Sequence, residues 1–404
     1  MIKRCLTFIM VTLLAVSSCF VVGCDKGKDD SKGNGTTPRP APTAAPTKDP
    51  AVVDFSLKTM DAETLFNNSK VQGRTKVVDY QAGKGIALDF TASSVEFRAC
   101  CEGDVSAVIH ANPMAIDANR RPVLFINVYV DGVLQGTRDL YALTQGSHEL
   151  VLGKGLAKGT HTFMIERQNE AEYGDLYVNS VSFSGEFDAR PEESNVYIEV
   201  IGDSITTGYG NLYPNNTGGA KDPLNNPRSS YYQDGTRAYA CLAMKKLGAD
   251  YSIIAQQGIG AGIGWQPHTM LETYEKTCYQ RGRNDAWGFE KQPDLVVINL
   301  GSNDMSCEKG WTEKQIQDGF VSLIKMVRKN NPDAKILWAF GGVTPVAAPL
   351  VEAAVKEAGG EAAGIYAFTD FVNNNEGGIG HPVVSAHEQN AELLVKEVKK
   401  ILGL

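Results

Sequence analysis

The sequence lacks an excess of positive charge. Its 404 residues include 39 Lys and Arg against 47 Asp and Glu, which gives a formal net charge of −8 at pH 7. Proteins that bind nucleic acids usually gather Lys and Arg on one face, and this composition offers no such surplus. We therefore expect no nucleic-acid partner.

Long hydrophobic runs are missing after residue 24. No later stretch reaches the roughly 20 apolar residues that a membrane-spanning helix needs. Hydrophobic residues nevertheless make up 43% of the chain and charged residues 21%, as in proteins that bury ordinary cores, so the chain is not wholly disordered. At roughly 100–200 residues per domain, the length predicts two domains once any targeting segment is removed.

Pairs of Cys and His at the spacing of zinc sites are also absent, and we expect neither a metal nor a cofactor. Eight cysteines are present, but two precede residue 20 and a third, Cys24, has the separate role described below. The remaining five are odd in number and their pairing is undetermined, so they do not predict a disulfide scaffold. These five are Cys100, Cys101, Cys241, Cys278 and Cys307.

The first 24 residues predict where the protein resides. Lys3 and Arg4 precede an apolar segment, residues 6–22, as in a secretory signal peptide. This segment ends in Val21-Val22-Gly23-Cys24, which resembles the lipobox of bacterial lipoproteins. The resemblance implies a signal peptide over residues 1–23 and lipidation of Cys24. Several acyl chains on one residue give stable attachment, so we expect a lipid-anchored protein of the cell envelope. An uncleaved signal anchor is the alternative.

Residues 24–50 form a low-complexity linker after the lipidated cysteine. Five prolines fall here among Thr, Ala, Gly and charged residues, with too few apolar groups to offset the entropy of ordering the chain. Pro-rich linkers favour extended conformations. We interpret the segment as a tether, and the charges that follow Cys24 are similar to signals that send some lipoproteins to the outer surface.

Residues 51–187 are predicted to form an all-β, jelly-roll-like sandwich. The apolar run at residues 123–130 is followed by Asp131-Gly132, a strong signal for a tight hairpin. Three further strand patterns, at residues 148–152, 159–166 and 176–183, recur at the spacing of a sandwich, and long helical periodicity is absent. Whether this domain binds sugars or is a structural appendage stays open.

Residues 188–404 are predicted to form a three-layer α/β domain. Helical patterns cover residues 236–247, ended by Gly248, and residues 312–329. Short apolar runs alternate with such helices and predict a five-stranded parallel sheet buried on both faces. The site of such a domain lies at the carboxyl ends of its strands. The five runs are residues 196–201, 251–255, 294–300, 335–340 and 365–368.

Residues typical of ester hydrolysis follow four of these strands. Gly202-Asp203-Ser204 follows the first strand, Gly258 the second, Gly301-Ser302-Asn303-Asp304 the third, and His381 the last. Because the carboxyl ends of parallel strands meet at one edge, we expect these residues to lie together. A serine on a tight turn between strand and helix exposes its hydroxyl, and nearby backbone N–H groups can hold an oxyanion.

In order and spacing, these segments resemble the SGNH (GDSL-type) hydrolases. The runs Glu199–Gly210 and Ile298–Asp304 are further similar to carbohydrate esterase family 2, whose members carry a β-sandwich ahead of the hydrolase domain. The resemblance covers residues 51–404, most clearly in the C-terminal domain. It implies hydrolysis of O-acetyl esters on plant polysaccharides such as xylan or glucomannan, whereas the residues alone indicate only a serine ester hydrolase.

The resemblance also implies a role for each residue. Ser204 would be the nucleophile that forms an acetyl-enzyme, and His381 would be the base that takes its proton and later activates water. The oxyanion hole would consist of the N–H groups of Ser204 and Gly258 and the side-chain amide of Asn303.

One position departs from the family pattern. SGNH hydrolases typically place an acid three residues before the histidine, and here that position is Gly378. Some members of carbohydrate esterase family 2 resemble Ser–His dyads, and by this resemblance we favour a dyad in which a backbone carbonyl orients the imidazole of His381. Glu376 or Asp370 as a substitute acid is the alternative. A carbonyl accepts the same hydrogen bond as a carboxylate but supplies no full charge.

Four further side chains are candidates for the cleft or for its surroundings. Trp265 and Trp311 follow the second and third strands and could stack on a sugar, with hydrophobic cover of a loop as the alternative. His268 lies either in the cleft or on a surface loop. His387, one or two turns into the last helix, is expected to be a solvated or capping histidine.

Two functions from different classes follow. The first is a surface-tethered deacetylase whose partners are acetylated polysaccharides or oligosaccharides and, through the lipid anchor, the membrane. The alternative is a carbohydrate-binding surface lipoprotein with a weak or inactive cleft, which the missing acid supports. A lipase or thioesterase fits less well, because Gly210–Asp234 is rich in Asn, Gly and Tyr rather than in apolar residues.

Overall fold

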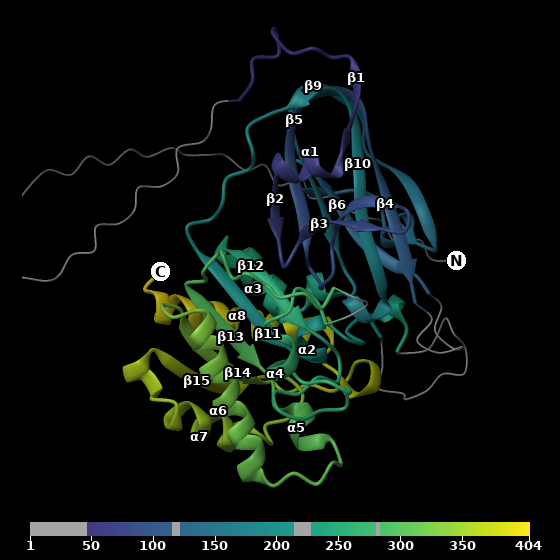
Figure 1. Ribbon diagram of the computed structural model, residues 1–404. Coiled ribbons are helices and arrows are strands. Elements are labelled where there is room, and N and C mark those ends of the chain that lie inside the picture. Colours follow the sequence, from purple (N-terminus) through teal and green to yellow (C-terminus); the bar gives the residue numbers. More distant parts are fainter. Residues whose placement is uncertain (1–46, 115–121, 214–227, 280–282) are drawn as a thin grey trace, which may run out of the picture. The chain divides into compact units, whose positions relative to one another are not determined.

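The computed structural model describes residues 47–114, 122–213, 228–279 and 283–404. The expected signal peptide, Cys24 with its expected lipidation and most of the linker lie outside these residues, as does the middle of Gly210–Asp234. Residues 44–404 form one unit that holds two sheets (Figure 1). Among the helices described, none is both long enough and apolar enough to cross a membrane.

The first sheet is antiparallel and forms the expected β-sandwich around its own core. Its main path runs in the order β3-β4-β10-β5-β9-β6-β7, while β1 pairs with β10, β2 with β5 and β8 with β6. A short helix, α1 (Ala62–Asn67), lies between the first two strands. The strands are β1 (Leu57–Asp61), β2 (Ser69–Gln72), β3 (Lys76–Tyr80), β4 (Gly83–Ala87), β5 (Ser94–Pro113), β6 (Leu124–Val130), β7 (Val133–Leu134), β8 (Ala142–Leu143), β9 (Gly146–Arg167) and β10 (Gly174–Phe187).

Two details of this sheet test the sequence-based predictions. The hairpin at Asp131-Gly132 is confirmed, and both residues have the positive φ angles, 51° and 77°, that a type I′ turn requires. The two strands expected at residues 148–152 and 159–166 are instead one strand, β9. Bulges in its pairing with β5 absorb the glycines between them, so the sheet bends where a break was expected.

The second sheet is parallel and has the five strands that the sequence predicts. Their order is β12-β11-β13-β14-β15, so the first strand in sequence, β11, lies between the second and the third. Apart from the first residue of β11 and the first of β14, every position of β11 to β14 is buried, as a sheet covered on both faces requires. The strands are β11 (Tyr197–Gly202), β12 (Asp250–Ala255), β13 (Leu295–Asn299), β14 (Lys335–Gly341) and β15 (Ile365–Phe371).

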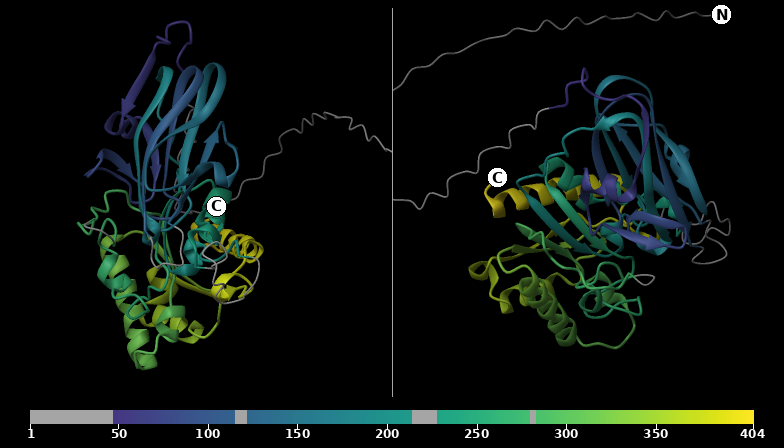
Figure 2. Two further views of the ribbon diagram at one scale, coloured as in Figure 1. Left: turned by 90° about the vertical axis from the view of Figure 1, so that its right-hand side faces the viewer. Right: turned by 45° about the horizontal axis from the view of Figure 1, so that its top comes forward.

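Helices cover both faces of this parallel sheet (Figures 1 and 2). Alternate residues of β13 point to opposite faces: Val297 packs with helices α3 and α8, and Ile298 with α6 and α7. The predicted helix after residue 236 begins three residues late, after a short 3₁₀ turn, and ends at Gly248 as expected. The four helices are α3 (Tyr239–Leu247), α6 (Glu313–Asn330), α7 (Ala348–Glu357) and α8 (Val384–Leu402).

The connection between β9 and β10 joins the sandwich to the α/β domain. Within this connection, Gln168 accepts the backbone N–H of Gly235 at its carbonyl at 3.0 Å. Arg138, in the turn between β7 and β8, also reaches the α/β domain and donates to the carbonyl of Gln233 at 2.7 Å. A second contact lies beside β2, where Gln72 accepts from the backbone N–H of Tyr251 at 2.7 Å. Segments of the sandwich therefore reach loops of the α/β domain, including loops that follow its strands.

Candidate active site

Ser204 lies where β11 ends and the short helix α2 (Ser204–Thr207) begins. Asp203 caps this helix by accepting the N–H of Ile205 at 3.0 Å. The turn is tight, since a side chain at Gly202 would collide with Thr206. The sequence thus folds locally into a strand–turn–helix that presents the hydroxyl of Ser204 at the carboxyl edge of the sheet.

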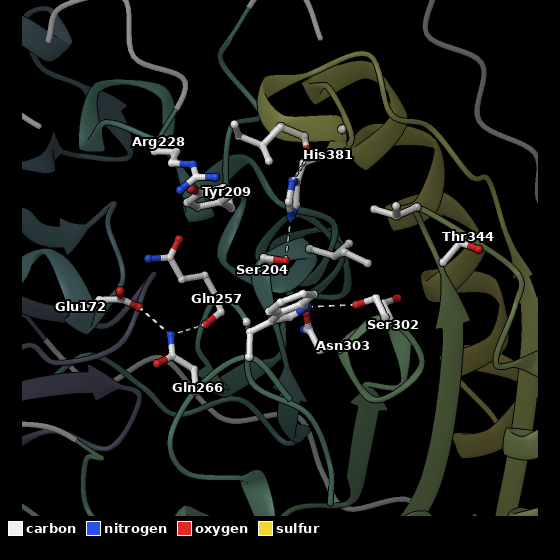
Figure 3. Close-up of a pocket in the computed structure, with 17 residues that line it drawn as sticks. Glu172, Ser204, Tyr209, Arg228, Gln257, Gln266, Ser302, Asn303, Thr344 and His381 are labelled. Atoms are coloured by element: carbon white, nitrogen blue, oxygen red, sulfur yellow. Dashed lines mark hydrogen bonds between the residues drawn. The ribbon is translucent and has the colours of Figure 1, made fainter. Parts of the chain in front are cut away.

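His381 comes from the loop between β15 and α8, and its imidazole points at Ser204 (Figure 3). The distance between its Nε2 and the Oγ of Ser204 is 2.8 Å. Its Nδ1 lies 3.0 Å from the carbonyl oxygen of Ile379 and 3.2 Å from that of Gly378. The structure therefore brings together the serine and the histidine that the sequence proposed, although 177 residues separate them along the chain.

Both acceptors at Nδ1 of His381 are backbone carbonyls. Glu376 and Asp370, the two alternative acids, are exposed, and neither is among the hydrogen-bond partners of the imidazole. Burial lowers the pKa of His381 to about 4, while the two carbonyls act in the opposite direction. The imidazole is therefore neutral at physiological pH, with Nδ1 donating to the backbone and Nε2 available to accept a proton.

The expected oxyanion residues lie on the same pocket as Ser204. Gly258, at a φ of +74°, belongs to the loop after β12, and Asn303 to the short helix α5 (Ser302–Ser306) after β13. The side-chain nitrogen of Asn303 lies 3.1 Å from a carboxylate oxygen of Asp203 and 2.8 Å from the carbonyl of Ile259. These two contacts hold the amide beside Ser204.

Asp304 fixes the loop that carries Gly258. Its carboxylate accepts the backbone N–H groups of Ala261, Gly262 and Ile263 at 3.0–3.2 Å. Burial raises the pKa of Asp304, and these three donors act against that rise. The aspartate thus shapes the loop that carries Gly258 through the backbone of that loop.

The site opens into a pocket of about 580 Å³. Several lining residues carry no recognisable motif and were not singled out from the sequence. One of them is Glu172, which belongs to the sandwich and accepts a hydrogen bond from Gln266 at 3.1 Å (Figure 3). The ring of Tyr209 packs edge-on against His381. Its place in the run Glu199–Gly210, which carries the family resemblance, is a sequence signal for this residue. Gln257 and Arg228 also line the pocket.

The remaining candidates separate into one pocket residue and three others. Trp265 lines the pocket, is 58% exposed and donates from Nε1 to Ser306 at 3.0 Å. Trp311 is not among the residues that line this pocket; its ring packs over Gly262 and is 41% exposed. His268 is half-buried beside the pocket, with Nε2 2.6 Å from the side chain of Gln256.

His387 is not solvated, but it makes a capping contact with the first residue of another helix, α3. It is fully buried in α8, where its Nδ1 accepts the backbone N–H of Tyr239 at 3.3 Å and its ring stacks on that tyrosine. Tertiary packing of α8 on α3 decides this burial. Within the part of the chain that the structure describes, no three His, Cys, Asp or Glu side chains gather as metal ligands would.

Residues 200–381, which span Ser204 and His381, match the GDSL-like Lipase/Acylhydrolase family. This region is a GDSL-like hydrolase domain. It begins inside β11 and ends at His381, so it contains every catalytic residue that the motifs predicted.

Outside the GDSL-like domain, the similarity extends into the sandwich. The chain is 29% identical over 341 residues to the cellulase/esterase CelE of Acetivibrio thermocellus, a match that covers 80% of this chain and 37% of CelE. It is 26% identical over 203 residues to an acetylxylan esterase/glucomannan deacetylase of Cellvibrio japonicus, covering 46% of this chain and 53% of that protein. The chain therefore spans about half or less of the length of these relatives.

The whole two-domain arrangement also has a counterpart among solved structures. A family two carbohydrate esterase from Clostridium thermocellum, solved in complex with cellohexaose, is similar with a TM-score of 0.71 and 25% identity. This match covers 83% of the present chain and 99% of that one. The sandwich followed by a GDSL-like domain is thus the architecture of a carbohydrate esterase, as the sequence motifs predicted.

Proposed function

We propose that this protein is a serine esterase that removes O-acetyl groups from plant polysaccharides such as xylan and glucomannan. The observation that carries the proposal is the 2.8 Å contact between Ser204 Oγ and His381 Nε2 at the floor of an open pocket. The proposed substrate class is supported by the similarity of the chain to an acetylxylan esterase/glucomannan deacetylase and to a family two carbohydrate esterase.

The first half of the reaction acylates the serine. As the Oγ of Ser204 attacks the acetyl carbonyl, its proton passes to Nε2 of His381. Negative charge then develops on the former carbonyl oxygen, where the N–H groups of Ser204 and Gly258 and the amide of Asn303 stabilise it. His381 gives the proton to the sugar oxygen, the ester bond breaks, and acetyl-Ser204 remains.

The second half releases acetate. His381 takes a proton from water as the water oxygen attacks the acetyl-enzyme, and it returns that proton to Ser204 when the acyl bond breaks. The pair works as a dyad, because Nδ1–H of the imidazole donates to the carbonyls of Ile379 and Gly378 rather than to an acid. Carbonyls fix the tautomer and the ring orientation but stabilise imidazolium less than a carboxylate would.

Acetate release from acetylated xylan and acetylated glucomannan tests the proposal. The full chain is expected to release acetate, and Ser204→Ala is expected to release none above background. If the folded wild-type protein is retained by the polysaccharide but releases no acetate, the esterase is excluded and the carbohydrate-binding alternative takes its place.

We also propose that Cys24 anchors the protein to a bacterial membrane through its lipid. The support is the sequence pattern at residues 21–24, which lies outside the described residues. Fractionation of cells that express the full chain is expected to place it with the membranes, and Cys24→Ala is expected to shift it to the soluble fraction. Equal distributions would contradict the anchor.

A further inference from the structure

Glu170 is a fully buried carboxylate at the end of the sandwich that meets the GDSL-like domain. Both of its carboxylate oxygens accept hydrogen bonds from that domain. Oε1 accepts the side-chain amide of Gln233 at 2.7 Å, and Oε2 accepts the backbone N–H of Gln257 at 2.8 Å. The backbone N–H of Glu170 also donates to the side-chain oxygen of Gln233 at 3.0 Å. Glu170 is therefore matched to N–H donors on two separate loops.

The first of these loops contributes an oxyanion donor. Gln257 immediately precedes Gly258, whose N–H is expected in the oxyanion hole. The peptide between them is held at its oxygen, because the carbonyl of Gln257 accepts from Gln266 at 2.8 Å, and Gln266 in turn donates to Glu172. The preceding peptide is held at the N–H of Gln257 by Glu170. Two glutamates of the sandwich, Glu170 at the N–H of Gln257 and Glu172 through Gln266 at its carbonyl, thus hold the two peptides that flank Gln257 (Figure 3 shows the second path).

The second loop leads to the nucleophile. The amide of Gln233 that donates to Glu170 also donates to the hydroxyl of Thr207 at 3.1 Å. That hydroxyl donates to the carbonyl oxygen of Ser204 at 3.1 Å. Gln233 and Thr207 are fully buried, so water does not compete for these bonds. One carboxylate therefore connects the turn that carries Ser204 with the loop that carries Gly258.

Burial of the Glu170 carboxylate disfavours its ionised form. Burial raises the pKa of Glu170 and the charge of Glu172 acts in the same direction, while the donors of Gln257 and Gln233 and the charge of Arg167 act against both. A carboxylate removed from water destabilises a protein unless its oxygens are hydrogen-bonded, and groups perturbed in this way concentrate at functional sites.

We propose that Glu170 is a positioning residue for the oxyanion hole, which makes the β-sandwich a working part of the esterase site. It holds the N–H groups of Ser204 and Gly258 at the separation that the oxyanion needs. The inference rests on the proposed esterase function. It assigns the sandwich a role in catalysis that is independent of any binding of polysaccharide by that domain.

The variant Glu170→Gln tests the role with little change of shape. A glutamine amide must direct its NH₂ group at a donor, either the N–H of Gln257 or the amide of Gln233, so one bond is lost. Because the oxyanion exists only in the transition state, kcat for 4-nitrophenyl acetate is expected to fall by about tenfold to a hundredfold, while KM changes by less than about twofold.

Exchange of the two side chains provides the matched rescue. In Glu170→Gln/Gln233→Glu, the introduced amide can accept from the N–H of Gln257 and donate to the introduced carboxylate. The hydroxyl of Thr207 can turn to donate to that carboxylate only by giving up its bond to the carbonyl of Ser204, so the recovery is expected to be partial. The net charge and the volume of the pair are unchanged. Gln233→Glu alone places two buried carboxylates in contact. Both single variants are expected to lose kcat, and the double variant is expected to recover to within about fivefold of wild type.

Asp188→Asn is the control for a general loss of stability. Asp188 is a buried carboxylate that follows the other end of β10 and accepts from Thr160 and from the backbone N–H of Ala189. This variant is expected to lower the unfolding temperature and leave kcat unchanged. If Glu170→Gln does not fold, Thr207→Val, which removes the hydroxyl between Gln233 and Ser204 and leaves the bonds of Glu170 in place, is expected to lower kcat several-fold.

Three results would overturn the inference. They are an unchanged kcat in Glu170→Gln, a loss of kcat in Asp188→Asn as large as that in Glu170→Gln, or a double variant no better than the single ones. Failure of the substrate proposal is distinguishable. A protein that hydrolyses 4-nitrophenyl acetate but releases no acetate from polysaccharide loses its proposed substrate, and the kcat series still decides the role of Glu170. If the wild-type protein does not hydrolyse 4-nitrophenyl acetate and its Ser204 does not react with diethyl 4-nitrophenyl phosphate, both the esterase function and the role of Glu170 would be overturned.

Discussion

The imidazole Nδ1 of His381 lies 3.0 Å from the carbonyl oxygen of Ile379, a β-branched residue with a φ of +54°. Such residues rarely adopt the left-handed region, so this backbone is strained. Hydrogen bonds hold the loop on both sides, from Gly377 N–H to the carbonyl of His381 and from Gly378 N–H to the carbonyl of Gly210. The strain directs a carbonyl to the place where SGNH hydrolases usually have an acid.

Ile379→Pro is expected to lower kcat by about a hundredfold. Proline fixes φ near −65°, so the carbonyl of residue 379 would turn away and the imidazole of His381 would lose its orientation. Ile379→Asn is the comparison, since asparagine tolerates a positive φ and keeps the carbonyl in place. Kinetics on 4-nitrophenyl acetate check this, and equal losses in the two variants would show that the side chain of Ile379 matters rather than its backbone.

Trp265→Ala is expected to weaken substrate binding without affecting the chemistry. The exposed ring of Trp265 lines the pocket, where it can stack on a sugar face. An aromatic contact of this kind corresponds to about a threefold to tenfold rise in KM for acetylated xylan oligosaccharides. The matched control is Trp311→Ala, which removes a ring outside the pocket lining. A rise in KM for both variants, or for 4-nitrophenyl acetate as well, would contradict a sugar-stacking role.

The pH dependence of kcat is expected to report Glu170 rather than His381. Burial lowers the pKa of His381 to about 4, so the base stays neutral over most of the acidic range. The pKa of Glu170 is raised, and the charged or titratable groups that face it are Glu172, Arg167 and Tyr279. As the pH falls through this raised pKa, protonation converts an acceptor oxygen into a donor and kcat declines.

Glu170→Gln cannot titrate, so its profile should lack that decline and fall only near the pKa of His381. Profiles of kcat for 4-nitrophenyl acetate, recorded for both proteins between pH 4 and pH 9 (roughly the range spanned by these groups), make the comparison. A shared acid limb near the ordinary value of histidine would show that His381 titrates like a solvated imidazole.

His387→Asn is expected to make the stability less sensitive to acid. Burial lowers the pKa of His387 to about 3, and its Nε2 has no protein partner among the described residues. In the unfolded chain His387 binds a proton at about pH 6.5, whereas in the native protein it binds one only near pH 3. Native stability therefore falls as the pH decreases across that window.

Urea unfolding at pH 7 and pH 4.5 (values chosen to lie roughly on either side of the free histidine pKa) measures this effect. The difference in unfolding free energy between wild type and His387→Asn should shrink by about 2 kcal/mol at the lower pH. The variant keeps a side-chain acceptor for the N–H of Tyr239. If the two proteins lose stability in parallel, His387 is protonated in the native state.

The architecture follows from local patterns in the sequence. Apolar runs bounded by turn signals predict the five parallel strands, because a strand buried on both faces must be apolar throughout. Parallel strands all end at one edge of the sheet. Four of the five strands are each followed by a candidate residue, namely Ser204, Gly258, Asn303 or His381, and this is enough to predict that the four meet. The Asp131-Gly132 hairpin can also be predicted from the sequence, because its turn type depends on these two adjacent residues alone.

Other features depend on segments that are distant in the sequence, and only the tertiary structure decides them. Partners such as Glu170 and Gln257 are 87 residues apart, and no local pattern records their contact. Burial of His387 depends on how α8 packs on α3, and the choice between an acid and a carbonyl at His381 depends on the strained backbone of Ile379. The sequence by itself determined which groups can react, because the type of each residue and its position after a given strand can both be read along the chain. The tertiary structure decided what orients them, because hydrogen bonds and burial depend on distances in space.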